Sequence, residues 1–169
     1  MKVDTRKLVV TAMLITLDVL FTRVLAINTN LMKIGFGFAA VGMCALLYGP
    51  LWAMLSAALG DFVGALLFPS GPFFPGFTFT AAVSGLIFGL CLHKKEAGRR
   101  RPILAAALNC LIVTVILNTA MIAYISGNSF SVLLAARAVQ FLIMFPVQSL
   151  VLVWLSRSET MEYVLEKYR

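Results

Sequence analysis

The sequence predicts an all-α membrane protein: a bundle of six transmembrane helices with both the N- and the C-terminus in the cytoplasm. Three observations predict this class: the composition, the length of the apolar runs, and the placement of charges between them. Of the 169 residues, 61% are hydrophobic and 12% are charged, whereas soluble domains carry about 45–50% apolar and about 25% charged residues. A soluble domain of this size would expose large apolar patches, so a lipid bilayer is the expected surrounding.

Six apolar runs predict the six helices. A transmembrane helix needs about 20 apolar residues, because it rises 1.5 Å per residue through a hydrocarbon layer of about 30 Å. The first run has this length and lacks a small-residue cleavage site, so we expect a retained helix rather than a removable signal peptide. The predicted helices span residues 8–27, 34–48, 51–68, 78–92, 102–125 and 131–155 of a single membrane domain, residues 1–169.

The connections between these runs carry turn and loop signals. Gly49-Pro50 marks a tight turn between two antiparallel helices. Residues 69–77 hold three prolines and two glycines, which predicts an ordered outer loop, because proline cannot continue a helix. Residues 93–101 form a basic cytoplasmic loop, and Pro102 stands in the first turn of the next helix, where proline is best tolerated.

The positive charges indicate the orientation. Eleven of the 14 Lys and Arg residues lie in three short polar segments that flank apolar runs. With six crossings these segments share one side of the membrane, and the positive-inside rule puts that side in the cytoplasm. The net charge of +7 is therefore an orientation signal, and we expect no nucleic-acid partner. The eleven residues are Lys2, Arg6, Lys7, Lys94, Lys95, Arg99, Arg100, Arg101, Arg157, Lys167 and Arg169.

Small residues recur at intervals of four on two of the predicted helices. Ser56, Gly60 and Gly64 repeat on the third helix, and Gly85 and Gly89 on the fourth. In lipid this spacing lets helix backbones approach closely. Two interpretations are open: packing within the bundle, or a docking face for a partner membrane protein.

The sequence carries no pattern that predicts a catalytic or metal site. Cys44, Cys91 and Cys110 stand singly inside apolar runs without a CxxC pair, which is typical of inert core residues. His93 opens the basic loop, and we interpret it as a solvated interfacial residue. We therefore expect neither a metal nor another cofactor.

Four polar residues inside the apolar helices are expected to meet. An ionic side chain in a membrane helix costs a few kcal/mol unless it is paired or hydrated. Counted from the predicted outer helix ends, Arg23 lies four residues deep, Arg137 six, and Asp61 and Asn118 seven, or roughly 6–10 Å for all four. They belong to four helices and lie beneath the outer loop and the connection that carries Lys33, so they predict a polar pocket with a lid.

This pocket has two interpretations. Asp61 can form a structural ion pair with Arg23 or Arg137 that leaves no room for a ligand. One arginine then stays unpaired, because Asp18 lies roughly 14 Å below the outer end of its helix, too deep to pair easily with it. The excess of cation otherwise predicts an anionic guest, since the planar arginine fork binds a carboxylate bidentately. Asp61 would then accept two hydrogen bonds from a pterin- or guanine-like heterocycle. The rings expected to stack on it are those of Phe36, Phe73, Phe74 and Phe77.

The middle third of the chain is also similar to a known family. The similarity is carried by IGFGF at 34–38, LYGPLW at 47–52, and above all by ALGD at 58–61, LLFP at 66–69 and GPFFPGFT at 71–78. These motifs resemble the folate-specific branch of the substrate-binding S components of energy-coupling factor (ECF) vitamin transporters. The helices with Arg23 and with Arg137 agree more loosely.

The resemblance implies a six-helix bundle that binds folate from outside with high affinity and has no transport activity alone. It implies a transmembrane scaffold subunit and two ATPase subunits as partners, and toppling of the loaded bundle within the membrane. The chain contains no GxxxxGK[ST] phosphate loop, so a partner must hydrolyse any ATP. Such proteins commonly carry two alanines four apart against the scaffold. Here Ala12 is followed by Thr16, which is still small enough for close packing.

Pocket position and resemblance together define the candidate residues. The candidate docking residues are Ala12 and Thr16. The candidate substrate-binding residues are Arg23, Lys33, Phe36, Asp61, Phe73, Phe74, Phe77, Thr78, Asn118, Arg137 and Gln140.

Three other functions are alternatives. An S component for another vitamin, such as riboflavin or a related heterocycle, would share the fold. A free-standing small-solute transporter is expected to show two similar halves, which this sequence lacks. An intramembrane enzyme would need a Ser–His pair or facing aspartates, whereas His93 lies on the side opposite the pocket and Asp18 and Asp61 differ in depth.

Overall fold

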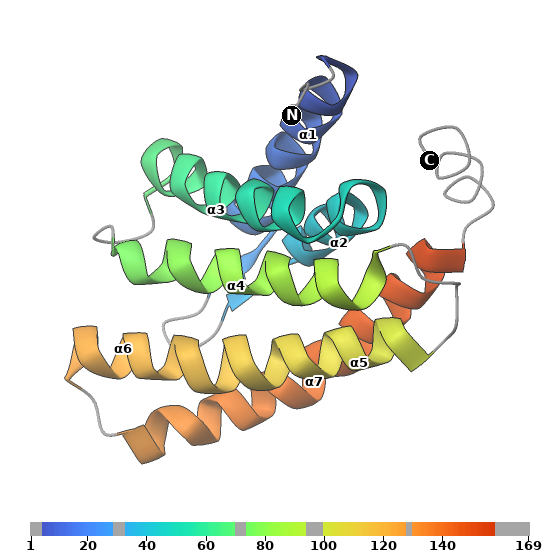
Figure 1. Cartoon of the computed structure of the whole chain (residues 1–169). Helices are drawn as coiled ribbons and strands as arrows, with labels where there is room; N and C mark the ends of the chain where they lie inside the picture. The colour runs from blue at the N-terminus through green and yellow to red at the C-terminus, as the bar shows by residue number, and fades with distance from the viewer. Residues whose placement is uncertain (1–4, 29–32, 70–73, 94–99, 128–129, 158–169) are drawn as a thin grey trace.

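The computed structural model describes residues 5–28, 33–69, 74–93, 100–127 and 130–157 of the chain. Within these ranges the backbone is almost entirely helical (Figure 1). Six helical segments are present, and the predicted all-α membrane fold is confirmed. The one addition is a small antiparallel hairpin, in which Ile27 pairs with Ile34 and Asn28 with Lys33.

The bounds of the elements follow the predicted runs closely. Two of the six helical segments contain a π-helical stretch, at η1 and η2. In chain order the elements are α1 Thr5–Val19 with η1 Leu20–Val24, β1 Ile27–Asn28, β2 Lys33–Ile34, α2 Gly37–Tyr48, α3 Pro50–Leu67, α4 Pro75–Leu92, the continuous segment α5 Arg100–Leu108, η2 Asn109–Leu117 and α6 Asn118–Ser126, and α7 Phe130–Arg157.

Proline and glycine set several helix ends. Gly49 has a φ of 89° and ends α2, and Pro50 opens α3 directly after it, so the predicted tight turn is present. Proline suits a first helical position because the missing N–H has no partner there in any helix. Gly127 adopts the left-handed conformation, with a φ of 65°, and its N–H bonds back to the Ala123 carbonyl. This cap separates α6 from α7.

Four helix ends differ by three residues from the sequence expectation: α1 begins at Thr5 rather than at residue 8, α2 begins at Gly37 rather than at residue 34, and two others have a clear structural reason. The first helical segment ends at Val24 rather than at residue 27, because the chain turns into strand β1. The fourth helix begins at Pro75 rather than at residue 78, so Phe77 lies in a helix and not in the outer loop. The reason is that the third proline of the loop opens α4 at its first turn, which proline tolerates, instead of extending the loop.

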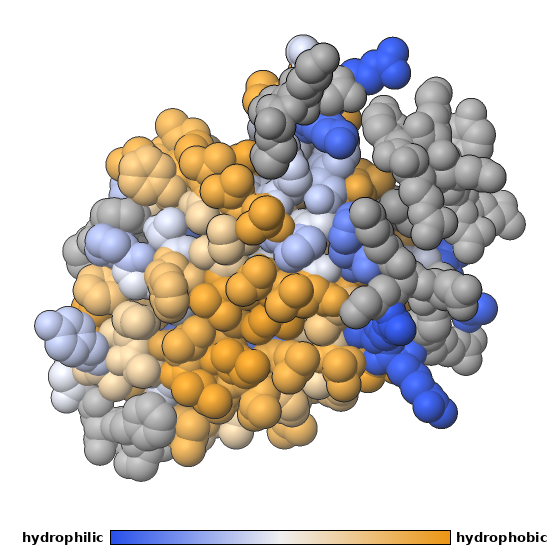
Figure 2. Space-filling view, in the orientation of Figure 1, coloured by the Kyte–Doolittle hydropathy of each residue, from blue (hydrophilic) through white to orange (hydrophobic). Residues whose placement is uncertain are grey.

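The outer surface of the bundle suits a bilayer. Four helical segments of the described chain are long and apolar enough to span a membrane: Pro50–Leu67, Pro75–Leu92, Arg100–Ile125 and Leu133–Arg157. Helix α2 is apolar but shorter. Figure 2 shows a broad hydrophobic area across one face of the molecule, with hydrophilic residues gathered towards the end where α5 begins. Large side chains such as Leu142 and Trp154 point outward, at 72% and 70% exposed, as expected beside lipid.

The small-residue stripes pack inside the bundle. A Cβ at Gly85 or Gly89 would overlap the α3 backbone near Ala53 and Pro50, so α4 lies directly against α3. Gly60 and Gly64 of α3 instead face side chains of the first helical segment, Asp18 and Arg23. These four glycines therefore serve packing between neighbouring helices, which favours the first of the two interpretations given above.

One end of the bundle collects the connections predicted to be cytoplasmic. The His93 ring lies against the Gly49 turn, where a Cβ at Gly49 would meet it at 3.0 Å. In Figure 1 the ends of α4 and α7 and the start of α5 lie at this same end. The opposite end, where α3 and α6 finish and α4 and α7 begin, is called the outer end below.

Candidate substrate-binding site

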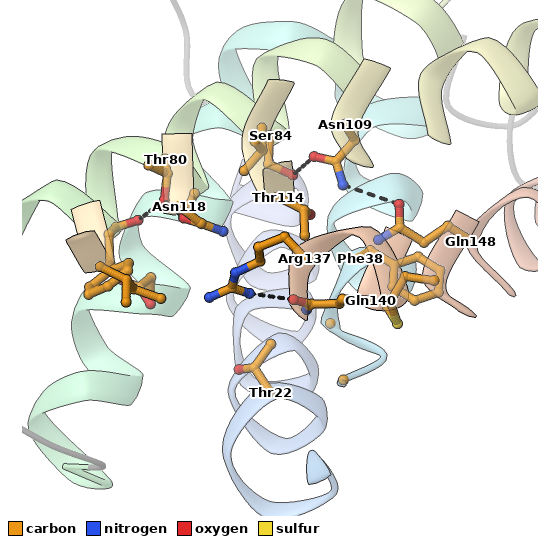
Figure 3. A pocket seen from close by; sticks show the side chains of 18 of the residues that line it. Thr22, Phe38, Thr80, Ser84, Asn109, Thr114, Asn118, Arg137, Gln140 and Gln148 are labelled. Atoms are coloured by element: carbon orange, nitrogen blue, oxygen red, sulfur yellow. Dashed lines mark hydrogen bonds between the residues drawn. The ribbon is translucent and has the colours of Figure 1, made fainter. Parts of the chain in front are cut away.

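A cavity of about 450 Å³ lies inside the bundle. Its walls come from nearly every helix, so it is a property of the fold as a whole (Figure 3). Seven of the predicted substrate-binding residues line it: Arg23, Asp61, Phe74, Phe77, Asn118, Arg137 and Gln140. The other described lining residues are Thr22, Gly35, Gly37, Phe38, Ala65, Thr80, Ala81, Ser84, Asn109, Val113, Thr114, Ile122, Met144 and Gln148.

The remaining four candidates have different positions. Thr78 is not among the lining residues of the described chain but donates a hydrogen bond to one of them, Asp61. Phe36 is 45% exposed and contacts Phe38, which does line the cavity. The backbone of Lys33 is in strand β2, and its side chain lies outside what the structure describes, as does the whole of Phe73.

Asp61 and Arg23 form an ion pair at the cavity wall. Arg23 Nη2 lies 3.1 Å from Asp61 Oδ1 and also donates to the Asp61 carbonyl oxygen at 3.4 Å. The Thr78 hydroxyl donates to Asp61 Oδ2 at 3.0 Å. Both carboxylate oxygens of Asp61 are thus already engaged by the protein. The internal pairing considered from the sequence does occur, yet a cavity remains beside it.

Arg137 of α7 is the second cation of the cavity. Arg137 is 5% exposed, and its Nη1 donates a hydrogen bond to the side-chain oxygen of Gln140. Its Nε has no hydrogen-bond partner among the described residues. Figure 3 shows the guanidinium directed into the space that Thr22, Asn118 and Gln140 surround. A buried cation without a carboxylate partner is costly unless a ligand compensates it.

A chain of neutral polar side chains lines the part of the cavity farther from the outer end. Ser84 Oγ donates to Asn109 Oδ1 at 2.7 Å, and Asn109 Nδ2 donates to Gln148 Oε1 at 3.1 Å. Nearer the outer end, Thr80 donates to Asn118 Oδ1 at 2.9 Å. The sequence analysis missed Ser84, Asn109 and this role of Gln148, although an amide inside the apolar run of the fifth helix was a usable signal.

The two π-helical stretches both contribute to the cavity. Thr22 and Arg23 lie in η1, and Asn109, Val113 and Thr114 lie in η2. A π turn widens the helix and shifts which side chains share a face, and such turns are frequent at functional sites. The face on which these residues lie therefore could not be derived from a regular 3.6-residue period.

Aromatic rings line the cavity from two helices. Phe74 and Phe77 pack edge to face with centroids 6.1 Å apart, and Phe74 also contacts Tyr124 of α6 at 6.2 Å. Phe38, which is buried, joins them from α2, a position that the sequence analysis had assigned to Phe36. These rings offer apolar faces to a flat ligand.

The candidate docking residues lie away from the cavity. Ala12 and Thr16 are both exposed on α1, four residues apart and thus on one face. The Thr16 hydroxyl donates to the Ala12 carbonyl at 3.0 Å. This satisfies the threonine hydroxyl within its own helix.

These features define a class of protein. A bundle of membrane-length helices around a buried cavity, with an arginine that lacks a carboxylate partner in the described chain, is a membrane-embedded binding protein for an anionic solute. The chain belongs to a family of this class, described as the ECF transporter, substrate-specific component, whose model matches residues 6–156.

Individual relatives are similar over most of the chain. The folate transporter FolT of Clostridium novyi (strain NT) is 38% identical over 141 residues, which are 83% of this chain and 82% of that protein. The folate transporter FolT of Leuconostoc mesenteroides is 35% identical over 172 residues, with 98% and 92% covered. A crystal structure of FolT bound with folic acid superposes with a TM-score of 0.86 at 32% identity, covering 90% of this chain and 93% of that one.

Family membership decides several of the alternatives. The family is a transporter component and not an enzyme, so the intramembrane-enzyme hypothesis is set aside. The chain is a multi-pass protein of the bacterial plasma membrane. As a substrate-specific component it is one part of a larger transporter, which also sets aside a free-standing carrier.

Proposed function

We propose that this chain binds extracellular folate with high affinity and delivers it for uptake as the S component of an ATP-driven ECF transporter. Two relatives that cover more than four fifths of the chain are folate transporters, and the similar solved structure holds folic acid. A cavity of about 450 Å³ falls within the roughly 300–1,000 Å³ range of pockets for drug-sized ligands.

The observation that carries the proposal is the buried guanidinium of Arg137. Folate is an anion. It consists of a flat pterin, an aromatic ring, and a glutamate with two carboxylates, and the aromatic ring joins the pterin to the glutamate. Arg137 compensates a carboxylate, for which its planar fork is suited. Phe38, Phe74 and Phe77 provide rings against the flat portion. The other candidate residues, Lys33, Phe36, Phe73 and Thr78 among them, stay part of this proposal.

The partners are part of the same proposal. The family implies a transmembrane scaffold and two ATPase subunits, and the sequence itself has no phosphate-binding loop. The exposed pair of Ala12 and Thr16 on α1 is the proposed contact with the scaffold, because small side chains let helices in lipid approach closely.

The test is to purify the protein from cells grown in rich medium and to identify the bound small molecule by mass spectrometry, followed by calorimetric titration with folate, riboflavin and thiamine. We expect folate to be recovered and to bind much more tightly than the other two. Arg137→Ala should lose most of the affinity, whereas the matched variant Arg101→Ala, which changes an exposed arginine at the end where α5 begins, should keep it. Recovery of a flavin instead would refute the folate assignment.

A further inference from the structure

The charges in the cavity do not balance. The charged groups among its described lining residues are Arg23, Asp61 and Arg137. Arg23 and Asp61 lie 3.1 Å apart as an ion pair and cancel. Arg137 bonds to the neutral amide of Gln140. Two arginines against one carboxylate leave this part of the wall with a net charge of +1.

We propose that the site compensates one carboxylate of its substrate, and that Arg137 is the residue that compensates it. This rests on the proposed folate function and goes beyond it, because folate carries two carboxylates, at the α and γ positions of its glutamate. One of them is recognised inside the cavity. The other stays hydrated and contributes little to affinity.

The geometry of Arg137 supports a bidentate contact. Gln140 accepts from Nη1, and Nε, on the opposite edge of the guanidinium, has no hydrogen-bond partner in the described chain. The Nε–Nη2 edge presents two parallel N–H groups, which match the two oxygens of one carboxylate. A single carboxylate therefore satisfies this edge completely.

A second carboxylate would need a cation of its own. Arg23 could approach it only by leaving Asp61, a half-buried carboxylate that would then keep only its hydrogen bond from Thr78, so the exchange gains little. Among the described residues, the inner end of the cavity offers the neutral groups Ser84, Asn109 and Gln148, which already bond to each other. The described lining residues can therefore neutralise one negative charge of the ligand, through Arg137.

The test compares folate with its two mono-amides, in which either the α or the γ carboxylate is replaced by a carboxamide. Calorimetric titration of the purified full-length chain gives the three affinities. We expect one mono-amide to bind within about threefold of folate and the other at least about tenfold more weakly, the value of one charged hydrogen-bonding contact. This comparison on the native chain needs no variant.

Variants then identify the cation. In Arg137→Gln, folate and both amides should bind equally weakly, within about threefold of each other, because the charge that distinguishes them is gone. Arg137→Lys keeps the charge and should keep the order of the ligands. Arg101→Gln, which changes an exposed arginine where α5 begins, should leave the discrimination intact.

The outcomes separate this proposal from the function on which it rests. Equal losses for both amides on the native chain would show that two carboxylates are compensated and would overturn it. Discrimination that persists in Arg137→Gln would assign the role to another residue and overturn it as well. A native chain that does not bind folate at all would refute the proposed function itself.

Discussion

Replacing Arg137 by glutamine is expected to weaken folate binding and to stabilise the empty protein at the same time. The side chain is buried, and no carboxylate of the described chain pairs with it. On insertion scales an arginine at the centre of a membrane helix costs about 2.5–3.5 kcal/mol. The Gln140 bond and the polar cavity reduce this cost, so we expect the free energy of unfolding of the ligand-free variant to rise by about 1–2 kcal/mol.

The loss of affinity has the opposite sign and is larger. Removing one partner of a desolvated, hydrogen-bonded charge pair costs roughly 2–5 kcal/mol of binding free energy. At about 1.4 kcal/mol per tenfold change, this is a loss of between about 30-fold and a few thousand-fold. The assay is thermal unfolding of the detergent-solubilised protein with and without folate, combined with calorimetric titration.

Arg23 provides the matched comparison within the same cavity. Its guanidinium pairs with Asp61 at 3.1 Å, so Arg23→Gln leaves a carboxylate without its partner and should destabilise the empty protein. Breaking a fully buried pair costs about 3–5 kcal/mol, and we expect less here because the two side chains are 11% and 22% exposed. If Arg137→Gln also lowered the stability of the empty protein by more than about 1 kcal/mol, Arg137 would be a structural residue and the reasoning would be wrong.

Three further predictions follow from the packing. Gly89→Ala places a methyl group against the α3 backbone and should lower the free energy of unfolding by roughly 1–3 kcal/mol, measured by thermal unfolding. In Gly64→Ala the methyl group meets the flexible side chain of Arg23, so this variant should lose folate affinity more than stability. Equal losses of stability in the two variants would contradict this difference. Asn109→Ala removes its hydrogen bonds to half-buried Ser84 and buried Gln148, whose oxygen then accepts only from the Cys110 thiol, and should cost roughly 1–3 kcal/mol of unfolding free energy; an unchanged melting temperature would show that water replaces the amide. Ala12→Leu should leave folate affinity unchanged but prevent co-purification with the scaffold and ATPase subunits, and intact assembly would exclude the proposed docking face.

Depth in the membrane was predictable from the sequence. An α-helix rises 1.5 Å per residue regardless of its side chains, so counting from the helix ends placed Arg23, Asp61, Asn118 and Arg137 at one level, and all four line the same cavity. Which arginine pairs with Asp61 was not predictable. That choice depends on how each helix is rotated about its axis, and the rotation is set by packing against glycines of neighbouring helices.

Two features of the cavity wall were not predictable from the sequence, for a shared physical reason. Phe38 lines the cavity from α2, which begins at Gly37, and the candidate Phe36 precedes that helix and contacts Phe38. Asn109 was overlooked because it opens a π-helical stretch, where the period differs from the regular helix. A shift of one or two residues at a helix start, or one wide turn, changes the face that a side chain occupies, and neither leaves a mark in composition or hydropathy.

Of the three charged residues that line the described cavity, Arg23 and Asp61 also form contacts between helices, and Arg137 does not. Asp18 and Arg23 fill the space that Gly60 and Gly64 leave on α3, and Asp61 is held by Arg23 and Thr78. Changes at these positions alter the fold and the site together. Arg137 bonds to Gln140, three residues away on its own helix, and to no side chain of another described helix. Its charge therefore contributes to the cavity and not to the packing between helices, which is why the opposite signs expected for Arg137→Gln separate ligand recognition from structure.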